Sequence, residues 1–355
     1  MSLLYDRMYG CLAATRVASS MGAHTEGKSR EQIRAEYGVL DEFRPYHHYS
    51  DRTDWVHPAG STEDGIERQK LMCTAIIRKQ GRITADDLVA TWIDVCDPEK
   101  MVNMTEQFDR DLLAVAKAGI VPAAALGGFC RHLHLNTTIR SFHALCLINA
   151  GDIPSMIADL HDVGRVYQPL TSDSFPWGVA YNAAVVHAMT PDATPDSVVQ
   201  TALDYAVPMI RRQLERDLAI ARKYRDPLDM ADELNANYTA RDAHYDMSRA
   251  HETACRAISI FAVARGDVRR SIVAAVNFGR DTDCLAASAG GLAGALQGID
   301  AVPPEWVQQV DDVTKDHPFT NSRLSMKETT DGIYEAFRSK VDAMKRYVTF
   351  AEASW

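Results

Sequence analysis

The chain has no pair of cysteines with the CxxC spacing, although seven cysteines are scattered along its 355 residues. Zinc ribbons and thioredoxin-type redox sites use that spacing, so neither kind of site is expected. The N-terminus also lacks a basic segment followed by a long apolar block, which argues against a secretory signal. These absences predict a cytoplasmic protein whose thiols stay reduced.

Long apolar runs and an excess of positive charge are missing as well. The uncharged run at residues 284–299 is shorter than the ~20 apolar residues that a membrane span needs. The net charge is −10, from 38 Lys and Arg against 48 Asp and Glu, so the sequence shows no overall basic excess of the kind a nucleic-acid binder carries. We therefore expect neither a membrane nor a nucleic acid as a partner.

Alternating strand patterns are scarce, whereas apolar residues recur at helical spacing along most of the chain. The predicted fold class is therefore all-α, in one compact domain. Helices are expected over residues 3–21, 65–79, 108–118, 154–168, 177–189, 195–223, 248–265, 267–277, 284–297 and 328–349.

Two short acidic segments each stand directly before an expected helix. Residues 61–64 read Ser-Thr-Glu-Asp, and residues 281–284 read Asp-Thr-Asp-Cys. Such residues often only cap a helix and complement its dipole. The helix after Asp283, however, carries no charge before Asp300, which indicates that its start is buried. Buried carboxylates are costly unless a cation or strong hydrogen-bond donors compensate them.

Hydroxyl and carboxylate oxygens are the ligands that Mg²⁺, Ca²⁺ and Mn²⁺ prefer. If the two acidic segments meet in the fold, one binuclear site would account for both, with a shared carboxylate bridging ions ~3.5–4 Å apart. A third segment, residues 10–27, has small residues that permit close helix packing. It ends near Glu26, which taken alone is an ordinary loop carboxylate.

Taken together, these three segments resemble the ADP-ribosylglycohydrolase family. Residues 10–27, GCLAATRVASSMGAHTEG, follow the family's opening pattern GCLLGxAxGDALGxPxEG without gaps. Residues 59–65 match its GxxTDDT segment, and residues 277–298 match its NxGGDTDTxAAxxGxxxGAxxG segment. The resemblance covers roughly residues 5–310. It makes residues 1–355 a single domain of this type, with a C-terminal helical extension over residues 311–355.

The resemblance implies an all-α fold around two divalent cations, Mg²⁺ or Mn²⁺. The implied ligands are Thr62, Glu63, Asp64, Asp281, Asp283 and Cys284. Asp283 would bridge the ions, and Glu26, Asp64 and Asp283 would be the catalytic residues. The ions would hold a ribose diol and acidify a water, which attacks the anomeric carbon through an oxocarbenium-like state. The reaction would cleave an N- or O-ribosyl bond in an ADP-ribosylated protein or a ribosylated small molecule.

Several positions depart from the family pattern. Ser19 stands where the family has aspartate, Glu63 replaces aspartate, and Gly65 replaces threonine. Cys284 also replaces threonine, and a thiol is a softer and poorer Mg²⁺ ligand than a hydroxyl. Arg280 replaces glycine. It would either grip a phosphate or carboxylate of the substrate or form an ordinary ion pair.

Substrate contacts are expected from two of the long connections. Asn136, Thr137 and Arg140 are candidates in the connection over residues 119–142. Tyr49 and Trp55 offer rings that could stack on a planar group of the substrate, and aromatic packing of their own loop is the alternative.

The leading prediction is thus a metal-dependent ribosyl hydrolase. The departures leave open whether its substrate is an ADP-ribosylated protein or a small ribosylated metabolite or nucleoside. A non-catalytic binding or structural protein with the same fold is a further alternative, because a fold does not determine a function. The retained acidic residues argue against this last alternative.

Overall fold

The computed structural model describes residues 2–48, 54–241 and 245–354. Within these residues every regular element is helical, and two isolated bridges, Tyr46 with His57 and Leu135 with Arg249, are the only β-type pairings. The predicted all-α class is confirmed. Among the described helices, none combines the length and the apolar character that a bilayer span requires.

The elements follow one another as a series of α-helices with three short 3₁₀ helices. They are α1 (Leu3–Gly22), α2 (Arg30–Tyr37), α3 (Asp64–Lys79), α4 (Ala85–Val95), η1 (Lys100–Asn103), α5 (Gln107–Ala118), η2 (Ala123–Phe129), α6 (Thr137–Arg140), α7 (His143–Ile148), α8 (Ile153–Gly164), α9 (Ser174–Ala188), α10 (Pro195–Asp204), α11 (Pro208–Ala221), α12 (Ala231–Asn235), α13 (Ala250–Ala264), α14 (Val268–Val276), α15 (Thr282–Gln297), η3 (Ile299–Ala301), α16 (Pro304–Asp316) and α17 (Met326–Ser354).

The helix expected over residues 195–223 is two helices in the structure. Pro208 lacks a backbone N–H and disfavours a helical conformation of the residue before it. It therefore starts a new helix, α11, at its first position, where the missing N–H costs nothing. The break between α10, which ends at Asp204, and α11 follows from this proline.

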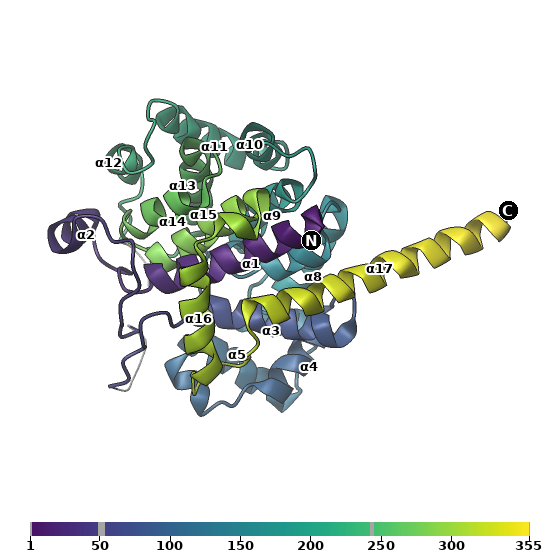
Figure 1. Ribbon diagram of the computed structural model, residues 1–355. Helices are drawn as coiled ribbons and strands as arrows, with labels where there is room; N and C mark the ends of the chain where they lie inside the picture. Colours follow the sequence, from purple (N-terminus) through teal and green to yellow (C-terminus); the bar gives the residue numbers. More distant parts are fainter. Residues whose placement is uncertain (1, 49–53, 242–244, 355) are drawn as a thin grey trace.

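Helices α1 and α15 pack against each other through small residues at the centre of the fold. In Figure 1, α10–α14 lie on one side of this pair and α3–α5 on the other. A Cβ atom placed on Gly294 would lie 2.2 Å from the carbonyl oxygen of Gly10, and one on Gly22 would lie 2.5 Å from that of Thr282. The two backbones therefore touch, and the end of α1 is held beside the start of α15.

This close approach predicts a stability defect when a methyl group is added at the contact. Gly294→Ala places Cβ against backbone that cannot rotate away, and overpacking of this kind costs about 1–3 kcal/mol. The free energy of unfolding, measured by urea denaturation, should fall accordingly. Gly128→Ala is the matched control, because no heavy atom lies within 4 Å of the added Cβ. Equal stability of the two variants would contradict the packing.

The predicted extension over residues 311–355 contains the end of α16 and the long α17. The first half of α17 packs into the body through the buried residues Met326, Ile333 and Ala336. Its second half projects away from the body, as Figure 1 shows, and carries exposed apolar residues such as Tyr347 and Phe350.

Candidate metal centre

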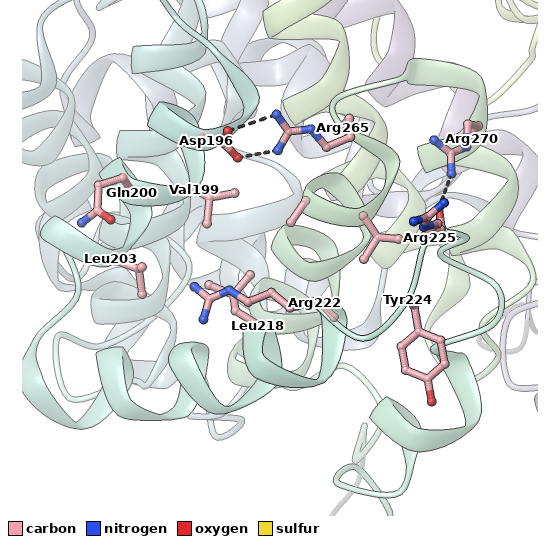
Figure 2. A pocket seen from close by; sticks show the side chains of 13 residues that line it. Asp196, Val199, Gln200, Leu203, Leu218, Arg222, Tyr224, Arg225, Arg265 and Arg270 are labelled. Atoms are coloured by element: carbon pink, nitrogen blue, oxygen red, sulfur yellow. Dashed lines mark hydrogen bonds and ion pairs between the residues drawn. The ribbon is translucent and has the colours of Figure 1, made fainter.

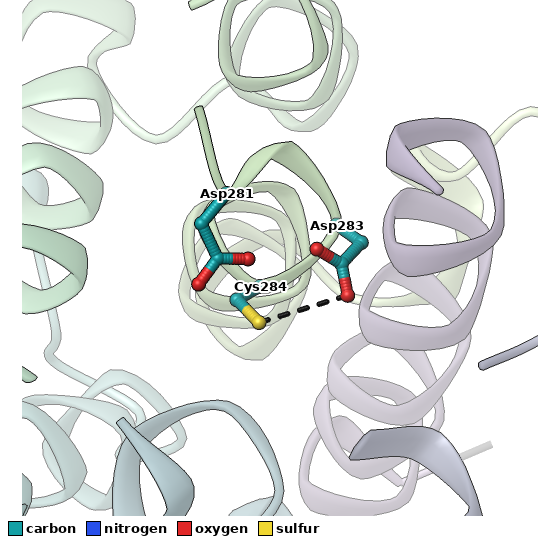
Figure 3. A group of neighbouring side chains, drawn as sticks. All are labelled: Asp281, Asp283 and Cys284. Atoms are coloured by element: carbon teal, nitrogen blue, oxygen red, sulfur yellow. Dashed lines mark hydrogen bonds between the residues drawn. The ribbon is translucent and has the colours of Figure 1, made fainter. Parts of the chain in front are cut away.

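The starts of α3 and α15 meet inside the protein and bring the two acidic segments together. Carboxylate oxygens of Glu63, Asp64 and Asp283 lie within 4.8 Å of one another. Ligand atoms of Asp281, Asp283 and Cys284 form a second such group, so Asp283 belongs to both. All five side chains are buried, with at most 3 % exposure. Figure 3 shows the second group at the first turn of α15.

The two groups differ in whether their carboxylates cap a helix. Glu63 is the N-cap of α3 and accepts hydrogen bonds from the backbone N–H of Gly65 (2.7 Å) and Ile66 (3.3 Å). Asp281 is the N-cap residue of α15, yet its carboxylate accepts no bond from that helix. Helix capping therefore accounts for Glu63 and leaves the burial of Asp281 and Asp283 unexplained.

The guanidinium of Arg140 lies between the carboxylates of the first group. Its Nη1 donates to Glu63 Oε2 at 2.6 Å and to Asp283 Oδ2 at 3.3 Å, and its Nη2 donates to Asp64 Oδ1 at 2.6 Å. Burial raises the pKa of Asp64, but the positive charges of Arg140 and Arg68 outweigh burial and hold that pKa well below its usual range. Arg140 thus offsets part of the negative charge of the first group, although burial still raises the pKa of Glu63 to about 8.

The second group is less well compensated, since Arg140 reaches it only through Asp283 Oδ2, at 3.3 Å. Asp281 Oδ1 and Asp283 Oδ1 are buried and have no hydrogen-bond donor among the described residues. Burial and then the nearby Asp281 carboxylate raise the pKa of Asp283 well above its usual value. Two buried, unpaired carboxylate oxygens side by side are a donor set that suits one hard divalent cation.

Cys284 contributes a neutral thiol to this group. Its Sγ donates to Asp283 Oδ2 at 3.6 Å, the dashed line in Figure 3. Burial raises the pKa of Cys284 well above the usual thiol value, so the sulfur stays protonated in the absence of a metal. It is therefore a soft and uncharged donor beside hard, charged ones.

Exchange of this sulfur for oxygen should change the order of metal preference. Cys284→Ser is expected to raise Mg²⁺ affinity several-fold and to lower Cd²⁺ affinity, because the hydroxyl is the harder ligand. Isothermal titration calorimetry with both ions measures the change. Cys96→Ser, at the end of α4, is the control. A marked loss of Mg²⁺ binding in Cys284→Ser would show that the thiol has a role of its own.

Residues around the carboxylates hold them in place. Asn136, predicted as a substrate contact, donates from Nδ2 to Asp281 Oδ2 at 2.9 Å. Ser19, at the position where the family has aspartate, donates to Glu63 Oε1 at 2.5 Å. Thr62 accepts a hydrogen bond from the buried ammonium of Lys70 at 2.9 Å, which occupies part of its capacity as a ligand.

Glu26 lies just beyond the end of α1 and is half-buried. Burial, followed by the negative charges of Asp283 and Asp281, raises its pKa well above the usual value. Glu26 lines a narrow cleft with Asn136 and Thr137, and Asp64, Arg140 and Cys284 also face it.

Sequence reasoning missed Arg68 and Asp109. Arg68 Nη2 lies 2.7 Å from Asp64 Oδ2, and its Nε donates to Asp109 Oδ1 at 2.9 Å. The contact between Arg68 and Asp64 could have been predicted, because residues four apart in a helix lie on the same face and opposite charges at that spacing attract. Asp109 comes from α5, and no local pattern connects it to the site.

Three further residues were predicted as possible substrate contacts. Arg280 is buried and forms an ion pair with Glu252 at 2.6 Å. Its φ of 69° is a left-handed conformation that costs a non-glycine residue roughly 1–3 kcal/mol. Trp55 packs edge-on against Phe319, with ring centroids 5.0 Å apart, as in the packing alternative. Tyr49 lies outside the described residues.

A larger cavity lies apart from this centre, between α10, α11 and α13. Its volume is about 540 Å³, and Figure 2 shows several arginines around it. Arg265 is paired there with Asp196, at 3.0 Å from Nη2 to Oδ2. None of the residues predicted for the site lines this cavity.

The fold agrees with the comparisons to known proteins. Residues 1–341 match the ADP-ribosylglycohydrolase family, and the chain belongs to that family. The family predicted from the three motifs is thus confirmed, and with it membership in a family of glycohydrolases.

The two relatives and the solved structure named here are distant from this chain or similar to it only locally. The uncharacterized protein YegU of Escherichia coli K12 is 22 % identical over 325 residues, which span 87 % of this chain and 93 % of YegU. The ADP-ribosylarginine hydrolase Tri1 of Pseudomonas putida GB-1 is 52 % identical over 40 residues, 11 % of each chain. A solved structure titled ADP-ribosylglycohydrolase-related protein complex superposes with a TM-score of 0.66 at 16 % identity, covering 96 % of this chain and 99 % of that one.

Proposed function

We propose that this protein is a metal-dependent hydrolase that cleaves the N- or O-ribosyl bond of an ADP-ribosylated protein or of a ribosylated small molecule in the cytoplasm. The observation that carries the proposal is the pair of buried carboxylate oxygens on Asp281 and Asp283 that have no hydrogen-bond donor among the described residues. They are grouped with Cys284, which lines the same narrow cleft as Glu26. Membership in a glycohydrolase family and the local similarity to a hydrolase named for ADP-ribosylarginine support it.

Asp281 and Asp283 would hold a divalent cation, Mg²⁺ or Mn²⁺. When bound, such an ion polarises an oxygen ligand and makes a water a stronger nucleophile near neutral pH. Asn136 keeps the Asp281 carboxylate in place through its amide, so this ligand is fixed before any ion arrives.

Glu26 would act on the substrate itself. Burial and the negative charges of Asp283 and Asp281 raise its pKa, so it holds a proton at a higher pH than an ordinary carboxyl group does, and its side chain lines the cleft. In glycoside hydrolysis such a carboxyl group donates a proton to the leaving group or receives one from the water. Asp283 would contribute negative charge that favours an oxocarbenium-like state at the anomeric carbon, whereas Arg140 and Arg68 offset the charge of Asp64.

A screen of ribosylated compounds tests the proposal. The purified protein, with Mg²⁺ or Mn²⁺, is incubated with ADP-ribosylated arginine and serine peptides, ADP-ribose derivatives and nucleosides, and released ribose or ADP-ribose is measured. We expect turnover of at least one class and none with Glu26→Gln. Tight binding without turnover of any compound would instead indicate a non-catalytic binding protein.

A further inference from the structure

Position 65 needs a glycine because the side chain of Arg140 occupies the space next to it, and not because the backbone there has an unusual conformation. A Cβ atom on Gly65 would lie 2.1 Å from Arg140 Nη1, 2.4 Å from Cζ and 2.7 Å from Nε. Gly65 is not among the residues with positive φ, so its conformation is open to any residue. The missing side chain therefore leaves a space, and the guanidinium of Arg140 fills that space.

The guanidinium uses the oxygens that a cation would need. Glu63, Asp64 and Asp283 are close enough to share one ion, and Arg140 bonds to all three. Glu63 Oε1 is also engaged, by the hydroxyl of Ser19 at 2.5 Å. A divalent ion among these three oxygens would have to displace the guanidinium, because Nη1 and Nη2 already lie 2.6–3.3 Å from them and the two cations would repel each other.

The two halves of the centre are therefore unequal. On the α3 side, Asp64 Oδ1 accepts from Arg140, and its Oδ2 lies 2.7 Å from Arg68 Nη2. On the α15 side, Asp281 Oδ1 and Asp283 Oδ1 have no donor among the described residues. Residues from one short segment contact both halves. Asn136 donates a hydrogen bond to Asp281 on the α15 side, and Arg140, four residues later, enters the α3 side.

We propose that Arg140 takes the place of one divalent cation in this centre, so that the protein holds a single ion at Asp281 and Asp283, and that Gly65 is the residue that admits the guanidinium. This inference rests on the proposed metal-dependent function. It differs from the two-ion centre that the family resemblance implies, and it gives the departure at position 65 a physical reason.

Manganese binding to the wild-type protein and to Gly65→Ala tests the inference. The new methyl group meets only the mobile end of Arg140, so the variant should fold and push the guanidinium out of the carboxylate group. Calorimetry should give one Mn²⁺ per chain in the wild type and two in Gly65→Ala. Electron paramagnetic resonance should change from an isolated to a spin-coupled spectrum. Gly128→Ala, which meets no atom within 4 Å, should behave like the wild type.

Arg140→Met provides an independent test if the alanine variant folds poorly. It removes the charge at similar side-chain length, so it should also bind two Mn²⁺ ions, and its melting temperature should depend more strongly on Mn²⁺ than that of the wild type. Two ions in the wild-type protein, or one ion in both variants, would overturn the inference and leave the proposed function standing. No ion in the wild type would overturn the proposed function and the inference with it.

Discussion

Replacement of Asp283 by asparagine is expected to lower turnover on the order of 10²–10³-fold or more while the protein stays folded. Asp283 is the one carboxylate that belongs to both acidic groups, and its Oδ1 is one of the two unpaired oxygens. The amide has the same shape but no negative charge, so it weakens both metal binding and the stabilisation of positive charge on the substrate.

The stability of the same variant separates a catalytic effect from a structural one. Burial and the neighbouring Asp281 raise the pKa of Asp283, so the ionised side chain is unfavourable when no cation is bound. In EDTA, Asp283→Asn should therefore melt at the same temperature as the wild type or higher, and Mn²⁺ should no longer raise its melting temperature. Asp311→Asn, a half-buried position in α16, is the control and should keep full activity. Unchanged turnover in Asp283→Asn would remove Asp283 from the mechanism.

The burial of the segment around Asp281 and Asp283 could be anticipated from local signals in the sequence, whereas the meeting of α3 and α15 was implied only by the family resemblance. Each acidic segment stands directly before a helix, and the helix after Asp283 has no charged residue that would favour exposure of one face to solvent. A buried carboxylate pair at its start follows from those facts alone. The sequence could not show that the Glu63 side chain caps α3 whereas that of Asp281 caps no helix. An acidic residue directly before a helix looks the same in the sequence whether or not its side chain forms a cap.

The position of Arg140 could not be predicted. It ends α6, a helix of four residues that is too short for periodicity to indicate a direction. Its side chain enters the acidic centre because Gly65, 75 positions earlier, leaves room for it. Arg280, in contrast, is next to Asp281 in the sequence but does not pair with it. Two roles were predicted for it, a substrate contact and an ion pair, and in the structure it forms an ion pair with Glu252 of α13. Both outcomes depend on tertiary packing between distant segments.

Removal of divalent cations should abolish activity, and Mg²⁺ or Mn²⁺ should restore it. Without an ion, Asp281 and Asp283 face each other with unpaired oxygens in a buried place, and no described side chain donates to those oxygens. The protein should accordingly be less stable in EDTA. An ion at 100 times its dissociation constant adds about 2.7 kcal/mol to the free energy of unfolding, which raises the melting temperature by a few degrees in a chain of this size.

The measurement combines turnover of the substrate found in the screen with thermal melts, on protein whose residual metal has been determined by mass spectrometry. Mg²⁺, Mn²⁺ and Ca²⁺ are added back separately, because Ca²⁺ is larger and accepts more ligands than two aspartates and a thiol provide. We expect Ca²⁺ to stabilise less than Mn²⁺. Full activity in metal-free protein would mean that the buried carboxylates act on the substrate directly. Asp281 and Asp283 would then need donors from the substrate itself, since the described part of the chain offers none to their Oδ1 atoms.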